Sequence, residues 1–180
     1  MKMVDYKKDF KHLYVPSASP EIVEVPPMPF ITLSGAGDPN GEEFARQTEA
    51  LYSLSYAVKM SYKNGTAPAG YYEYKVFPLE GVWDLVDYSK PATDKSNLKY
   101  TIMIRQPDFL TEAEFERFLE LTKRKKPNPY LDHVRFEQVA DGWSCQMMHI
   151  GSYDEEPESF ARMEAYCEAQ GYVRASKTHR

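Results

Sequence analysis

YYEYKVFPLEGVW, residues 71–83, combines aromatic and β-branched residues at the density typical of a β-strand. Pro78 has no N–H to donate to a β-ladder, and Gly81 has no side chain to pack against a neighbouring strand. We therefore expect a strand with a bulge near these two residues, or a strand at the edge of its sheet. The polar segment 87–97 follows as a loop.

Two further strands and a helix surround this stretch in the first half of the chain. Residues 30–37 are predicted to form a strand that runs into a turn, and the alternating residues 98–105 predict a half-buried strand. Between them, Asn40 and Glu43 form a capping box at the start of a helix that ends at Gly65. The first half is therefore predicted to be β-α-β-β.

The second half contains fewer strands. A helix is predicted over 111–126, where Thr111 and Glu114 form a second capping box. Residues 134–150 predict a hairpin or a long bent strand around an Asp-Gly turn. A last helix is predicted over 158–170, so this half is predicted to be β-α-β with a short or missing final element.

Charge and cysteine content narrow the function classes. The 180 residues carry 22 Lys and Arg against 27 Asp and Glu, a net charge of −5, which argues against nucleic acid as a direct partner. We expect no membrane span and no secretory signal, because no long apolar run is present. Cys145 and Cys167 are too few and too far apart in sequence for a zinc knuckle or a redox pair, and we expect a cytoplasmic protein.

The aromatic content is high, at 14% of the chain, with 14 Tyr, 9 Phe and 2 Trp beside 8 Met. Tyrosine and methionine are adaptable contact residues, so this excess favours a ligand-binding surface. The alternative is a small core filled with tyrosine, and composition alone leaves both open.

The run Pro-Leu-Glu-Gly-Val-Trp at 78–83 resembles a signature of the GyrI-like small-molecule-binding family. The strand 101–107, the helix start at 111–114 and the strand 145–151 are similar to that family in order and spacing, and the resemblance covers about residues 22–180. It implies an α+β fold of tandem pseudo-symmetric β-α-β-β modules, which form an antiparallel sheet with a ligand cleft between the halves.

On this resemblance we expect four segments. Residues 1–29 would be a Pro-rich N-terminal extension without regular backbone hydrogen bonding, 30–110 the first module, 111–132 a linking helix and loop, and 133–180 the second module. The family pattern continues beyond a basic stretch with a histidine into a further strand, whereas this sequence stops at that stretch. We therefore expect the second module to be truncated and to lack its last strand.

The resemblance also implies a function. The sequence resembles the stand-alone members of the family. It is similar to a subgroup of them that hydrolyses the cyclopropane of DNA-alkylating natural products and so detoxifies these compounds. Other members bind hydrophobic or cationic drugs without turnover, and some bind and inhibit DNA gyrase, for which this sequence offers no distinctive acidic surface. A multidrug-binding or sequestration module therefore remains the alternative to an enzyme.

Four residues are candidates for catalysis: Glu80, Tyr71, His149 and Tyr153. The Glu80 carboxylate can orient water or pair with a cationic ligand, or it can bind local backbone amides as a bulge residue. The phenols of Tyr71 and Tyr153 and the imidazole of His149 can polarise a conjugated carbonyl. For His149 and Tyr153 the alternative is a structural role.

Four further residues are candidates for ligand contact: Phe77, Trp83, Trp143 and Met147. Trp83 and Trp143 fall one in each half and suit planar ligands or cations, although either can be a core residue. We expect no cofactor and no metal site, and a planar hydrophobic or cationic small molecule as partner. A homodimer is left open.

Overall fold

The computed structural model describes residues 2–180, whose contacts group them into two units. The first unit contains residues 2–4, 28–139 and 178–180, and the second contains 5–27 and 140–177. Each unit is therefore assembled from segments that are far apart in the sequence. The module boundaries predicted from the sequence, at residues 29/30, 110/111 and 132/133, were drawn from an expected internal repeat. They stay a prediction.

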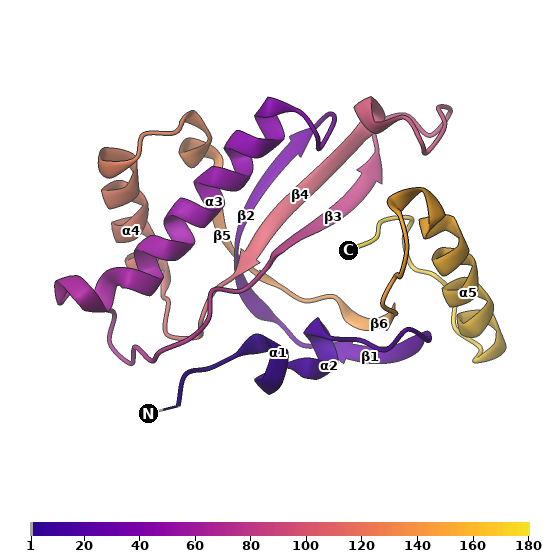
Figure 1. Cartoon of the computed structure of the whole chain (residues 1–180), viewed down its shortest axis with the longest axis horizontal. Coiled ribbons are helices and arrows are strands. Elements are labelled where there is room, and N and C mark those ends of the chain that lie inside the picture. Colours follow the sequence, from indigo (N-terminus) through magenta and orange to yellow (C-terminus); the bar gives the residue numbers. More distant parts are fainter. Residues whose placement is uncertain (1) are drawn as a thin grey trace. The chain divides into compact units, whose positions relative to one another are not determined.

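The first unit is built on a four-stranded antiparallel sheet with the order β3-β4-β2-β5 (Figure 1). The strands are β2 (Met28–Ala36), β3 (Leu79–Leu85), β4 (Leu98–Arg105) and β5 (Arg135–Val139). Side chains alternate between the faces, and Tyr100 of β4 donates its hydroxyl to Gln47 of α3 (Glu42–Met60) at 2.7 Å. The face that carries Tyr100 is called the helix face here, and the opposite one the second face.

The helices pack on the helix face, where the apolar core lies. Phe115 of α4 (Glu112–Lys125) stacks on Phe136 of β5 with ring centroids 5.4 Å apart, and Leu51 and Leu54 of α3 are fully buried. Three 3-10 turns complete the unit: η1 (Ser61–Asn64), η2 (Lys95–Asn97) and η3 (Pro129–His133).

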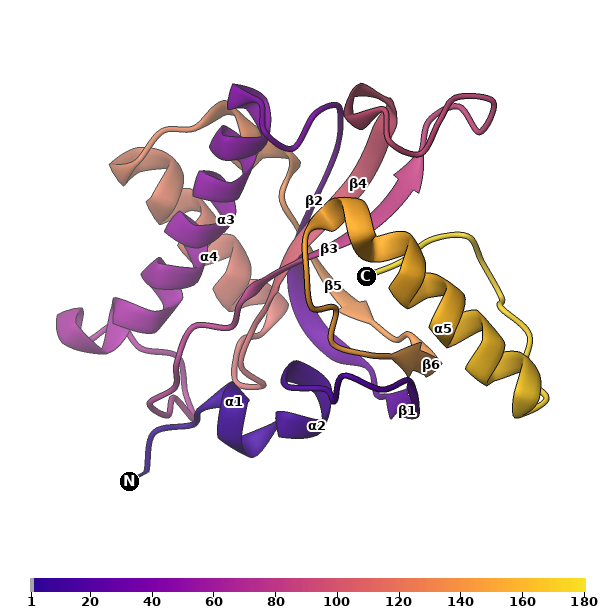
Figure 2. The ribbon, with the colours of Figure 1, turned by 45° about the vertical axis from the view of Figure 1, so that its right-hand side comes forward.

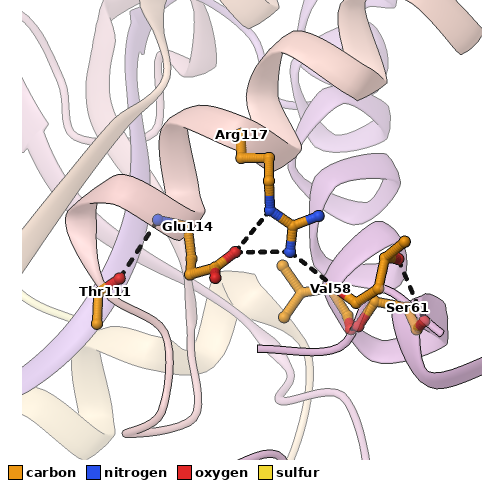
Figure 3. A network of polar contacts seen from close by, with 6 residues as sticks. Val58, Ser61, Thr111, Glu114 and Arg117 are labelled. Carbon is orange, nitrogen blue, oxygen red and sulfur yellow. Dashed lines mark hydrogen bonds and ion pairs between the residues drawn. The ribbon is translucent and has the colours of Figure 1, made fainter. Parts of the chain in front are cut away.

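A polar network joins α4 to the segment after α3 (Figure 3). The guanidinium of Arg117 is held by the carboxylate of Glu114 at 2.6 Å and donates to the carbonyl of Thr66 at 2.8 Å. Ser61 in turn donates to the carbonyl of Val58 at 2.7 Å. The Ser61 hydroxyl adds a second bond to the Val58 carbonyl, which also accepts from Ser61 N, and the Arg117 bond ties α4 to the segment that follows η1.

The second unit contains the two-stranded antiparallel pair β1 (Glu21–Val25) and β6 (Gly142–Gln146) with α5 (Glu156–Ala169) (Figure 2). Its other elements are α1 (Tyr6–Asp9), α2 (Lys11–Tyr14) and η4 (Tyr153–Glu155). Two hydrogen bonds hold the N-terminal segment to the C-terminal end of β6. The Gln146 side chain donates to His12 O at 2.7 Å, and Met148 N donates to Ser17 O at 2.7 Å.

The α+β class with antiparallel strands is confirmed, as are the strand at 98–105 and the helix at 111–126. The prediction of an irregular N-terminal extension was wrong. Pro16, Pro20, Pro26 and Pro27 flank α1, α2 and β1 and do not interrupt them, so hydrogen bonding is regular between the prolines.

Three local predictions also need correction. The strand expected over 71–83 starts only at Leu79. Of the two alternatives for it, the bulge is absent, because its seven residues pair one for one with β4, and the edge position is confirmed, because β3 is the outermost strand of its sheet. Of the two alternatives for residues 134–150, the hairpin is wrong, because β5 pairs with β2 and β6 pairs with β1; the segment forms two consecutive strands with Ala140 and Asp141 between them. The cap of α3 is Gly41, whose side chain offers no acceptor, and Asn40 instead binds Asp38.

Candidate functional site

The register of β3 divides the Pro-Leu-Glu-Gly-Val-Trp run between the two faces of the sheet. Gly81 and Trp83 lie opposite Ile102 and Tyr100 and share their helix face, whereas Glu80 lies opposite Met103 on the second face. Because the register has no bulge, Glu80 and Trp83 point to opposite faces.

On the second face, the carboxylate of Glu80 is paired with a guanidinium. Arg180 Nε lies 3.1 Å from Glu80 Oε1, and the two side chains are only 18% and 20% exposed, Arg180 and Glu80 respectively. The same guanidinium lies over the ring of Phe30 of β2, 4.9 Å from its centroid. A planar cation is thus held between an aromatic ring and a carboxylate, both of which favour its charge.

Backbone pairing brings Arg180 to this position. Trp83 N donates to His179 O at 2.8 Å, and His179 N donates to Trp83 O at 3.3 Å, which makes an antiparallel bridge on the free edge of β3. Residues 178–180 therefore extend the sheet of the first unit beside the strand that carries Glu80.

Phe77 and Arg105 repeat the same combination on the second face. Phe77 is buried at 3% exposure, and the guanidinium of Arg105 at the end of β4 lies 4.8 Å from the centroid of its ring. Arg105 is itself 7% exposed. The face therefore contains two buried aromatic rings, each with a guanidinium over it, next to one half-buried carboxylate.

Trp83 is a packing residue on the helix face. Its ring stacks on Phe44 of α3 with centroids 6.0 Å apart and lies 5.3 Å from the ring of Tyr100. A Cβ on Gly81 would lie 2.7 Å from Trp83 Nε1, so the glycine leaves room for the indole. The expected ligand contact of Trp83 stays a prediction.

Tyr71 lies in an aromatic cluster at the end of α3. Its hydroxyl donates to Lys59 O at 2.7 Å, and its ring contacts those of Tyr62, Tyr74 and Phe109. Burial, reinforced by the nearby carboxylate of Glu73, raises the pKa of Tyr71 to about 12. The phenol is therefore protonated at neutral pH, and its proton is committed to the Lys59 carbonyl.

In the second unit, both ring nitrogens of His149 are engaged. Nδ1 lies 2.8 Å from Ser159 Oγ on α5, and Nε2 lies 2.7 Å from the carbonyl of Ser152. The side chain lines a hollow of about 120 Å³ together with Met147, so the structure brings these two predicted residues together.

Trp143 and Tyr153 are exposed residues of the second unit. Trp143 lies on β6 opposite Glu24 of β1 and is 69% exposed, and Tyr153 begins η4 with 81% exposure. Large exposed aromatic rings are available for contact with a ligand or a partner. Their predicted roles stay predictions.

Sequence reasoning missed Phe30, Arg105, Arg180 and Ser159. The alternation of residues 98–105 places Arg105 on the polar side of its strand, and this pattern could have identified it. The sequence around Arg180 contains no pattern that indicates its position beside Glu80. The two cysteines lie closer together than their sequence separation suggested: the Cys167 thiol neighbours Cys145, and burial together with this neighbour raises the pKa of Cys145 to about 12, while both remain free thiols. Residues distant in sequence meet because α5 packs on β6.

Within residues 2–180, no group of His, Cys, Asp and Glu has the arrangement of a metal site. No helix in the same part of the chain is long and apolar enough to cross a membrane.

Residues 18–180 match the GyrI-like small molecule binding domain, and the chain belongs to that family. A crystal structure of an uncharacterized conserved protein from Listeria innocua is 35% identical, with a TM-score of 0.89 over 98% of this chain and 87% of that one. Two crystal structures described as those of a hydrolase from Listeria innocua are each 36% identical, with TM-scores of 0.87 and 0.84. They cover 94% and 93% of this chain and 82% and 81% of their own. No curated protein sequence gives a significant match.

Proposed function

We propose that the first unit binds planar aromatic or cationic small molecules on its second face, with Glu80 as the counter-ion. One observation carries this proposal: the guanidinium of Arg180 lies over Phe30 and against Glu80. A guanidinium is a planar, delocalised and weakly hydrated cation, which makes it a chemical stand-in for a cationic heteroaromatic ring. The position of this side chain thus supports a planar cation as the ligand of this face.

Binding of a planar cationic dye, followed by fluorescence, tests the proposal with two variants that act in opposite directions. Glu80→Gln removes the counter-ion and is expected to weaken binding about tenfold or more, since a hydrogen bond to a charged group contributes about 1.5–3 kcal/mol. Arg180→Ala removes the side chain that competes for the ring and the carboxylate, so it is expected to tighten binding.

Asp84→Asn provides the matched control, because Asp84 lies on the same strand and the same face as Glu80. It is expected to leave affinity within about twofold, the range of ordinary surface substitutions. A neutral planar analogue is expected to bind wild type and Glu80→Gln alike. Equal affinity of wild type and Glu80→Gln for the cationic dye would refute the counter-ion role.

We also propose that the protein adds water to the cyclopropane of DNA-alkylating natural products. The support is the description of two similar solved structures as a hydrolase. In this reaction a water oxygen bonds to a ring carbon, a strained C–C bond breaks, and its electron pair moves into the conjugated carbonyl. Glu80 would accept the water proton, which ends on the former carbonyl oxygen.

A hydrogen-bond donor that polarises the carbonyl is the second requirement of this reaction. Among the three residues considered for it, Tyr71 and His149 already bind carbonyl groups, at Lys59 and Ser152. Tyr71 lies in the same unit as Glu80, so we assign it this role in the proposal, with the substrate carbonyl replacing that of Lys59 as its acceptor.

A mass-spectrometric time course with a cyclopropane-bearing alkylator in molar excess tests turnover. Water-added product that exceeds the protein in molar amount is expected from wild type, and Glu80→Gln is expected to abolish it while neutral ligands still bind. Tyr71→Phe is expected to slow the same reaction. Binding without any product would identify a sequestration module instead of an enzyme.

A further inference from the structure

His149 and Ser159 form a hydrogen-bonded pair that lies entirely in the second unit. The Ser152 carbonyl can only accept a hydrogen bond, so His149 Nε2, 2.7 Å away, carries a proton. In the neutral imidazole, Nδ1 is then an acceptor, and the bond of 2.8 Å runs from Ser159 Oγ–H to Nδ1. A hydroxyl that donates to the free lone pair of an imidazole is the arrangement of an activated serine nucleophile.

The third group that such a pair requires is also present. Ser152 holds His149 through its carbonyl, and Ser152 is itself held by Glu155, whose Oε2 accepts from Ser152 N at 2.7 Å and from Ser152 Oγ at 2.9 Å. The imidazole is therefore fixed in one tautomer and one orientation. The bonds from Ser152 lower the pKa of the Glu155 carboxyl, so the group that holds Ser152 is a carboxylate.

The pair opens into the hollow of about 120 Å³, whose walls include Met147, Met148 and Ile150. Glu158 and Arg162 of α5 line it as well, and Arg162 follows Ser159 by three residues, on the same side of the helix. Arg162 forms no ion pair or hydrogen bond within residues 2–180, so its guanidinium is available to a developing negative charge. The volume suits a small acyl group.

We propose that Ser159 and His149 form a second reactive site, which hydrolyses esters of short carboxylic acids through an acyl-serine. Ser159 Oγ bonds to the ester carbonyl carbon and its proton moves to His149 Nδ1, while Arg162 faces the carbonyl oxygen. The ester C–O bond then breaks, and the leaving alkoxide takes the proton from Nδ1. Water adds to the acyl-serine with Nδ1 as base, which releases the carboxylic acid and restores Ser159.

The test uses the full chain with two probes, p-nitrophenyl acetate for turnover and a fluorophosphonate for covalent labelling. The fluorophosphonate forms an O–P bond to the serine and releases fluoride, so peptide mapping locates the adduct. We expect the adduct on Ser159, and we expect Ser159→Ala and His149→Asn to reduce p-nitrophenol release to the buffer rate.

Two control variants separate this site from other causes of activity. Ser144→Ala removes a hydroxyl of the same unit that donates to Gly142 O, and it is expected to keep both labelling and turnover. Asp84→Asn in the first unit is also expected to keep them, and the mapped adduct reports on Ser159 directly, so failure of the ligand-binding proposal leaves this one standing. Peptide mapping of the fluorophosphonate adduct on the wild-type protein tests the proposal even where a variant does not fold. Absence of an adduct on Ser159, or turnover that persists in Ser159→Ala, would overturn the proposal.

Discussion

At the scale of single residues, the Pro-Leu-Glu-Gly-Val-Trp run has a structural half on the helix face and another half on the second face, where we propose that the ligand binds. Glu80 points to the second face, while Gly81 and Trp83 point to the helix face. The run identified this strand from sequence, but it did not show which residue belonged to which face. That assignment depended on the absence of a bulge at Gly81, which only the pairing with β4 settles.

Gly81→Ala tests the structural half. The added Cβ would lie 2.7 Å from Trp83 Nε1, so the indole or the strand must shift, and we expect a loss of about 1–3 kcal/mol in the free energy of unfolding. Urea unfolding measures this loss, and the emission of Trp83 reports the displaced ring. Adding Trp83→Phe to the variant supplies a smaller ring and is expected to restore part of the stability. An unchanged unfolding midpoint for Gly81→Ala would contradict the packing described here.

At the scale of elements, the sequence predicted correctly those strands and helices that depend on neighbouring residues, through side-chain alternation and helix caps. Residues 98–105 alternate cleanly and form β4 with those bounds, and the helix at 111–126 begins at its Thr111 cap. Residues 71–78 have strand composition but form no strand, since their tyrosines pack in a cluster with Phe109. The Asp-Gly turn looked like a hairpin because sequence does not reveal that β5 and β6 have different partners.

The two predicted helix caps provide a matched comparison. Thr111 Oγ1 accepts from Glu114 N at 3.3 Å, whereas Asn40 does not cap α3. We expect Thr111→Ala to lower the free energy of unfolding by about 1 kcal/mol, and Asn40→Ala to change it by less than about 0.5 kcal/mol. Chemical unfolding of both variants measures the difference. Equal losses would show that the geometry at one of the two helix starts is wrong.

At the scale of the whole molecule, several groups with raised pKa values couple stability to alkaline pH, among them Tyr71 and Cys145. The pKa of Tyr71 rises from 10.0 to about 12, and that of Cys145 rises from 9.0 to about 12, both first because of burial. The folded protein therefore keeps protons that the unfolded chain releases. Their contribution to stability is complete below pH 9 and is lost as the pH rises toward about 12.

Urea unfolding across this pH range is expected to show a steady decline in the free energy of unfolding above pH 9. Tyr71→Phe removes one ionisable group and the bond to Lys59 O, so it is expected to flatten the decline and to lower stability at neutral pH by about 1 kcal/mol. Cys145→Ser is expected to flatten the decline as well. A profile that is the same in wild type and both variants would contradict these assignments.

The pairing of β1 with β6 has a consequence for synthesis on the ribosome. Gln146 bonds to Glu21 across a sequence separation of 125 residues, so β1 is made long before the strand that completes its ladder. Until then its backbone donors and acceptors are satisfied only by water or by another chain. Nascent chains halted before β6 are thus the form of this protein that is most exposed to capture by chaperones and to aggregation.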